Sequence, residues 1–395
     1  MRRLHAKKMN KQIIILFCLV LMCSCTNYTH ENISCEDCPV RIIDVLPLPE
    51  SSIFEMDECQ IEVVAELNLP NAFKYIDCQK MIYEDGYFYI LDEKYNRTIH
   101  AFDSLGNYHA NIGRRGRAEN EYINAPTDFF IDTQTKTIHV FERDSRRILI
   151  FNQDGGFVKD LKFNSWPYSL GYIKPGTYWA AFNYKKAGNN TGLGVFYPET
   201  DKIERAYNLK KDCAFVNKYR TFRKYDGINY HIPNLSDSVL VMKGDTITEI
   251  VKLRFNDSFI SDRIRNQVAV GDMHEYTSFC GVASISNYYE TSGFVTFSYT
   301  LSNVKINCLI DKLSGKQYQT TGSFVKGIFP GFSYAVMNDH ILWLITEENI
   351  EILPDELKGR IRNDEIVDGV HPLIKEIIKN RYTLPIIIKL SLVYE

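Results

Sequence analysis

The chain has 395 residues, of which 13% are aromatic and 24% are charged, and its formal net charge at pH 7 is −3. This length is enough to bury a large core, and the acidic balance argues against nucleic-acid binding, which needs a basic stripe to contact phosphates. The 25 Tyr and 23 Phe, together with few long helical patterns, favour β-strands, because aromatic side chains pack well on a pleated sheet.

The N-terminus has the pattern of a secretory signal. Five basic residues precede an apolar run from Ile13 to Met22 that is too short to span a bilayer comfortably. Met22-Cys23-Ser24-Cys25 resembles the bacterial lipobox, in which the final Cys receives a diacylglycerol group and becomes the mature N-terminus. The alternative is a plain signal peptide whose cysteines have no role.

The lipobox resemblance implies lipidation at Cys25 and a lipoprotein of the outer membrane, on either face of it. We therefore expect a lipoprotein signal peptide at residues 1–24, a lipid-anchored tether at residues 25–59 and a folded domain at residues 60–395. Removal of the signal would change the formal net charge to −8, because its five basic residues are lost with no acidic residue.

Cysteine spacing gives little further information. Cys35-Glu-Asp-Cys38 is a lone C-x-x-C pair, and a structural zinc site needs two more ligands near it. This pattern favours a local disulfide or two inert thiols over a metal site.

Strand patterns bounded by turn residues recur from residue 60 to the end of the chain. In chain order they are Ile61–Leu67, Tyr87–Leu91, Thr98–Phe102, Tyr108–Ile112, Asp128–Ile131, Thr137–Phe141, Arg147–Phe151, Phe157–Phe163, Tyr168–Ile173, Thr177–Phe182, Gly194–Tyr197, Lys202–Leu209, Asn229–Ile232, Ser238–Met242, Thr246–Phe255, Gly281–Ser286, Gly293–Tyr299, Lys305–Ile310, Gln317–Thr321, Phe332–Met337, His340–Ile345 and Pro385–Val393.

Two of these groups of strands repeat one another. Arg97, Ile99, Phe102 and Gly106 match Arg146, Ile148, Phe151 and Gly155 at one constant offset. A period of about fifty residues with four strands in each copy is typical of a β-propeller. The length of the domain favours an all-β, six-bladed propeller, and a count of seven blades remains open.

The last blade is interrupted by helical spacing between Pro354 and Arg381, which predicts one or two short inserted helices. A ring must also close, since unpaired strand edges promote aggregation. We therefore expect the early strand Ile61–Leu67 to pair beside the late strand Ile386–Val393.

The segments Ile112–Tyr122, Ala125–Asp132 and Arg146–Gly155 together resemble the NHL-type repeat. With the lipobox and the helix-then-strand ending, the chain resembles more closely the six-bladed β-propeller lipoproteins of Gram-negative gut-type bacteria. The resemblance covers about residues 60–395. It implies the fold, but it says little about chemistry.

The densest basic cluster after the signal comprises Arg114, Arg115 and Arg117, and Tyr122 follows it. Guanidinium groups on a glycine-bearing loop can hold the carboxylate or sulfate of an acidic sugar, so these four residues are the candidate ligand-binding site. Alternatively, the arginines form salt bridges with the neighbouring glutamates and fix a connection between blades.

No catalytic motif appears, and we assign no catalytic residue, metal ligand or cofactor. A divalent metal in the central channel is left open, because propeller enzymes take its ligands from several blades; Asp128 and Asn183 are candidates by position only. We expect four histidines to be core residues with hydrogen-bonded rings: His100, His139, His231 and His340. Four aromatic residues either stack on sugar rings or fill the space between blades: Trp166, Tyr168, Tyr172 and Trp179.

The sequence thus favours a membrane-anchored propeller that acts as a binding or scaffolding module, for glycans or for partner proteins of an uptake system. The alternatives are a metal-dependent hydrolase or lyase with its site in the channel, and a structural subunit of an envelope complex. A propeller supports any of these, because function lies in its loops and not in its fold.

Overall fold

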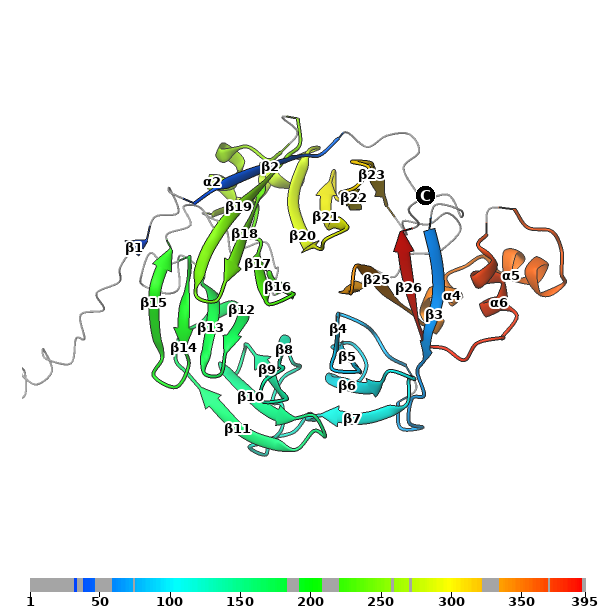
Figure 1. The fold of residues 1–395 in the computed structure, drawn as a ribbon, viewed down its shortest axis with the longest axis horizontal. Coiled ribbons are helices and arrows are strands. Elements are labelled where there is room, and N and C mark those ends of the chain that lie inside the picture. Colours follow the sequence, from blue (N-terminus) through cyan, green and yellow to red (C-terminus); the bar gives the residue numbers. More distant parts are fainter. Residues whose placement is uncertain are drawn as a thin grey trace, which may run out of the picture.

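The computed structural model describes residues 32–33, 38–46, 59–73, 75–182, 192–207, 220–256, 259–269, 272–321, 334–368 and 370–392. The predicted signal peptide, Cys25, Cys35 and Asn183 lie outside these residues. Within them, six antiparallel sheets form a ring around a central channel (Figure 1). The predicted six-bladed β-propeller is therefore confirmed.

Each blade is built on four antiparallel strands that follow one another outwards from the channel, and two of the blades gain a fifth strand from the N-terminal segment. The first three blades are β4 (Lys80–Glu84), β5 (Tyr87–Asp92), β6 (Thr98–Asp103) and β7 (Tyr108–Ile112); β8 (Asp128–Asp132), β9 (Thr137–Glu142), β10 (Arg147–Asn152) and β11 (Phe157–Lys162); and β12 (Pro167–Lys174), β13 (Thr177–Phe182), β14 (Leu193–Tyr197) and β15 (Lys202–Tyr207).

The other three blades contain more irregular connections. They are β16 (Phe222–Tyr225), β17 (Ile228–His231), β18 (Ser238–Lys243) and β19 (Thr246–Arg254); β20 (Val282–Glu290), β21 (Phe294–Leu301), β22 (Val304–Asp311) and β23 (Gln317–Thr320); and β24 (Tyr334–Met337), β25 (His340–Ile345), β26 (Ile386–Leu392) and β3 (Cys59–Glu66).

The ring closes in the sixth blade, where the first long strand meets the last one. β3 pairs antiparallel with β26, with Ile386 opposite Glu66 and Leu390 opposite Ile61 (Figure 1). This is the closure predicted from the sequence. It pairs β26 on both sides, with β25 and with β3, and β3 becomes the outermost strand of the blade.

The middle strands of the blades are buried almost throughout. All six residues of β13 are buried, as are five of the six in β5, β6 and β9. Such strands read as continuous apolar runs because the neighbouring blades cover both faces of each sheet.

The repeated glycine of the first two blades is a point of contact between blades. Gly106 and Gly155 adopt the left-handed conformation, with φ of +87° and +80°. A Cβ at Gly106 would lie 2.0 Å from the backbone oxygen of Glu66, and one at Gly155 would lie 2.5 Å from that of Asn111. Glu66 and Asn111 belong to the outermost strands β3 and β7 of the preceding blades. Glycine is therefore required twice over at this turn, by backbone conformation and by space.

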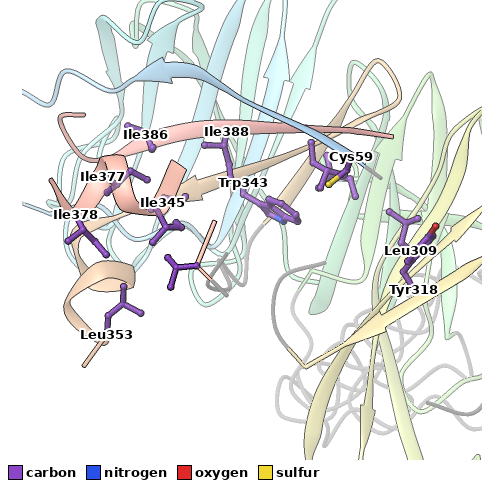
Figure 2. Close-up of a cluster of buried hydrophobic side chains, with 14 of the residues drawn as sticks. Cys59, Leu309, Tyr318, Trp343, Ile345, Leu353, Ile377, Ile378, Ile386 and Ile388 are labelled. Atoms are coloured by element: carbon purple, nitrogen blue, oxygen red, sulfur yellow. The ribbon is translucent and has the colours of Figure 1, made fainter. Parts of the chain in front are cut away.

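The insert in the sixth blade contains the predicted helices, α5 (Asp355–Arg362) and α6 (Pro372–Ile378), preceded by α4 (Glu347–Glu351). Ile377 and Ile378 of α6 pack on the apolar cluster that includes Ile345 and Ile386 of the blade (Figure 2). The amphipathic spacing in the sequence thus places an apolar helix face on the outer side of this sheet.

Several elements were not predicted. The innermost strands β4 and β16 were missed, as were α2 (Asp262–Ala269) and α3 (His274–Thr277). β4 and β16 are short and carry charged residues, which weakens the apolar signal of a strand. The polarity of these two strands is a consequence of their position beside the channel.

Part of the segment assigned to the tether also forms strands on the propeller. β1 (Asn32–Ile33) pairs parallel with β15, and β2 (Val40–Asp44) pairs parallel with β19 as a fifth strand of the fourth blade. Arg41 in β2 lies 2.7 Å from Glu249 and 2.7 Å from Glu290, which joins it to the fourth and fifth blades. These residues, which were predicted to belong to a tether, are thus part of the folded ring. Cys38, just before β2, has a free thiol.

Candidate functional site

The predicted arginine cluster lies on the connection between the first and second blades. The side chains of Arg114, Arg115 and Arg117 are exposed, and Nε of Arg114 donates to Oε1 of Glu121 at 2.8 Å. This ion pair is the salt-bridge alternative considered from the sequence. Because the arginines lie outside the two channel cavities described below, they are not brought together with the residues of those cavities.

Tyr122 has a packing role in this connection. Its side chain is fully buried, its ring packs edge-to-face on Phe151 and its hydroxyl donates to the carbonyl oxygen of Ile112. Backbone hydrogen bonds from Tyr122 to Arg114 and from Gly116 to Tyr122 close the loop. The proposed contact between Tyr122 and a ligand needs correction, since a ligand in solvent cannot reach a fully buried ring.

Two cavities that are lined by described residues lie at the central channel, and each has a volume of about 520 Å³. The turn-side cavity opens among the turns that follow the innermost strands. Its lining includes Tyr83, Phe130, Phe222, Tyr225 and Val336. Aromatic and aliphatic groups from the first, second, fourth and sixth blades therefore surround it.

The helix-side cavity opens beside α4 and is more polar. Its lining includes Gln79, Arg220, Asn287, Lys305 and Glu348. The two cavities share Lys80, Arg223 and Tyr289 in their linings, so they meet at these three residues. Four of the residues that line the helix-side cavity are basic, and they come from the first, fourth and fifth blades: Lys80, Arg220, Arg223 and Lys305.

Lys80 lies at the junction and is held by an ion pair. Its Nζ lies 2.6 Å from Oδ1 of Asp128 and 2.8 Å from the carbonyl oxygen of Phe129. Burial lowers the pKa of Lys80 to about 8, although the charge of Asp128 opposes this shift. The positive charges of Arg223 and Arg220 lower the pKa further. Asp128, a candidate metal ligand by position, is thus the partner of an ammonium group.

Arg223 is buried in β16 and fixed by neutral groups. Its Nη1 donates to the carbonyl oxygens of Arg220 at 2.8 Å and Phe222 at 2.9 Å, and its Nη2 donates to Oδ1 of Asn287. No carboxylate in the described part of the chain forms an ion pair with Arg223. Its charge is therefore held in place without being neutralised.

Two further cations complete the basic lining. Nη2 of Arg220 lies 2.5 Å from Oε1 of Glu93, while its Nε is buried with no hydrogen-bond acceptor among the described residues. Burial lowers the pKa of Lys305, and the charge of Arg223 adds to this effect. We refer to Lys80, Arg220, Arg223 and Lys305 as the basic cluster.

The carboxylates that line the helix-side cavity are engaged elsewhere. Asp77 accepts a hydrogen bond from Gln79 at 2.6 Å, and Glu348 accepts from Lys94 at 2.5 Å and from Tyr95 at 2.7 Å. Among the described residues that line the helix-side cavity, Asp77 and Glu348 are the carboxylates, and both accept these hydrogen bonds from groups outside the basic cluster.

The sequence stretch Arg220-Thr-Phe-Arg223-Lys224 carries three cations in five residues and could have signalled this site. It was overlooked because the spacing of cations along one strand does not reveal which residues of other blades they meet. The cluster is a product of ring closure, which brings β4, β16, β20 and β22 to one channel.

Three of the four predicted histidines are buried in the core, whereas His340 is only half-buried, and of the three only one has partners for both ring nitrogens. His139 contacts the hydroxyls of Tyr178 at 2.6 Å and Thr137 at 3.0 Å. His100 and His231 are buried with no hydrogen-bond partner for either ring nitrogen in the described residues. Burial lowers the pKa of His231 to about 3 and that of His139 to about 4.

Two of the noted aromatics fill space between blades. Tyr172 and Trp179 are buried in apolar clusters, whereas Trp166 is exposed and stacks under the guanidinium of Arg146 at 5.3 Å.

Within the described ranges, no group of three or more His, Cys, Asp or Glu residues could hold a metal ion. In the same ranges no helix is long and apolar enough to cross a membrane.

Six four-stranded antiparallel sheets around a polar channel define the protein as a six-bladed β-propeller. The sequence pattern of the family described as "Domain of unknown function (DUF4934)" matches residues 76–367, and the chain belongs to this family. The match spans all the strands from β4 to β25.

One solved structure supports the same fold, and a second is less similar. A protein of Bacteroides fragilis NCTC 9343 that is described as exported is similar over 90% of this chain and 100% of its own, with 12% identity and a TM-score of 0.73. A member of the DUF4221 family from Bacteroides vulgatus ATCC 8482 matches 85% of this chain and 100% of its own, with 12% identity and a TM-score of 0.46. No curated protein sequence matches this chain.

Proposed function

We propose that the protein is a lipid-anchored binding module of the bacterial cell envelope, which takes a glycan into its central channel. The N-terminal signal pattern supports the anchor, and the description of the Bacteroides fragilis relative as exported agrees with an envelope location. The observation that carries the binding role is the lining of the turn-side cavity.

That lining has the composition of a saccharide site. Tyr83, Phe130 and Tyr225 offer ring surfaces, while Asn229 and Lys224 offer polar contacts beside them. Sugar rings pack their C–H faces on aromatic side chains, and their hydroxyls need hydrogen-bond partners in the same pocket. A volume of about 520 Å³ is in the usual range for a small-molecule site.

A glycan array with the full chain in detergent tests this function. Val336→Trp would fill the turn-side cavity from β24, so we expect it to abolish binding. Val158→Trp is the matched control, because Val158 is exposed on the outer strand β11 of the second blade. Absence of binding to every saccharide on the array would contradict the proposal, as would equal binding by the two variants.

A further inference from the structure

The basic cluster is electrostatically unfavourable as it stands. Ion pairs with Asp128 and Glu93 neutralise Lys80 and Arg220. Arg223 has no carboxylate partner in the described chain, and its charge acts on both Lys80 and Lys305. Burying like charges close together costs free energy, because each charge loses its hydration and the charges repel one another. A ligand that supplies negative charge at this position would offset that cost.

Arg223 is also arranged to receive a ligand. A guanidinium group has five N–H donors in a fixed plane. Three hydrogen bonds, to the carbonyl oxygens of Arg220 and Phe222 and to Asn287, use three of them and fix the plane. Two donors remain at a junction that both cavities reach. A planar pair of donors suits an oxyanion, whose two oxygens can accept side by side.

We propose that the basic cluster binds an oxyanion, a carboxylate or sulfate group carried by a saccharide, with Arg223 and Lys305 as the main contacts. This inference rests on the proposed glycan binding in the channel and adds the charge of the ligand. The helix-side cavity, at about 520 Å³, is much larger than one inorganic oxyanion, so the rest of the ligand lies in the channel. Uronic acids and sulfated sugars share this chemistry.

Calorimetric titration of the full chain in detergent distinguishes the two sources of the charge. The probes are D-glucuronate, glucose 6-sulfate and, as the neutral reference, glucose. We expect at least one of the charged probes to bind about tenfold or more tightly than glucose, because a charge-assisted hydrogen bond to a fixed guanidinium contributes at least that factor. Binding should weaken as salt is raised.

Three variants locate the contact. Arg223→Gln removes the charge but keeps an amide that can donate to the same carbonyl oxygens, and Lys305→Gln removes the second charge from a half-buried position. Each should weaken binding of the charged probe by about tenfold and leave glucose unchanged. Arg263→Gln is the matched control, since this arginine of α2 is exposed outside both cavities, and this variant should bind as the unmodified chain does.

The outcomes separate this inference from the proposed function. If glucose binds as tightly as both charged probes and Val336→Trp abolishes all binding, channel binding holds and the oxyanion inference is wrong. The oxyanion inference is also wrong if Arg223→Gln and Lys305→Gln both bind the charged probe as tightly as the unmodified chain does. If Arg223→Gln does not fold, the result for Lys305→Gln alone tests the inference. If no saccharide binds on the array and none of the three probes binds, both proposals fail.

Discussion

Replacement of Gly155 by alanine tests how the blades are joined. The substitution places a Cβ 2.5 Å from the backbone oxygen of Asn111, about 1 Å short of ordinary contact. It also forces alanine into the left-handed region at φ +80°. The second and first blades must then move apart at this turn, since the obstacle is backbone and not the end of a flexible side chain.

The two costs can be separated with a control. Gly176 has a similar φ of +72°, but a Cβ there meets nothing within 4 Å, so Gly176→Ala measures the conformational cost alone. That cost is about 1 kcal/mol, and overpacking against backbone adds roughly 1–3 kcal/mol. We therefore expect Gly155→Ala to lower the free energy of unfolding by about 2–4 kcal/mol and Gly176→Ala by about 1 kcal/mol.

Urea unfolding of both variants, followed by tryptophan fluorescence, gives the two free energies. The midpoint for Gly155→Ala should lie clearly below that for Gly176→Ala. Equal midpoints would refute the reasoning, because they would mean that the repeated glycine is required only by its backbone conformation.

Three further predictions follow from other parts of the molecule. Burial lowers the pKa of His231 to about 3, below the ordinary value near 6.5, so the unfolded chain binds a proton more readily and stability falls as pH drops from 7 to 5. This residue should account for about 2 kcal/mol of that loss, and His231→Phe should flatten the dependence of the urea midpoint on pH; an unchanged slope would contradict the assignment. Cys25→Ala should release the protein from the membrane fraction, and its retention there would disprove lipidation at this residue. Arg41→Ala should speed amide hydrogen exchange across β2 while changing the urea midpoint little, since a half-exposed ion pair contributes at most about 1 kcal/mol; unchanged exchange would mean that the two ion pairs do not hold this strand.

The fold was predictable because its repeat can be recognised from the spacing of apolar residues and from the turn residues between strands. Phe102 and Phe151 mark the same buried position of successive blades, and Gly106 and Gly155 mark the same turn. The closure of the ring could also be derived, since an unpaired apolar strand at each end of the domain needs a partner. The repeat is thus visible in local sequence patterns, and the pairing of the first and last strands follows from the requirement that the ring be closed.

The candidate site was less predictable, for a physical reason. Arg114 and its neighbours are dense in the sequence but lie on an exposed connection. Arg223 and Lys305 are 82 positions apart in the chain and come together only because the fourth and fifth blades are adjacent in the ring. The same polarity that makes β16 part of the channel lining removed the apolar pattern by which a strand is recognised.

The central claim is that the channel carries an oxyanion site at the basic cluster, and crystals of the full chain soaked in sodium selenate test it most directly. Selenate has the shape and charge of sulfate, and its selenium gives an anomalous signal. The account predicts an anomalous peak within hydrogen-bond distance of Arg223 and Lys305, which Arg223→Gln removes. Anomalous peaks confined to surface arginines such as Arg114, with none in the channel, would contradict it.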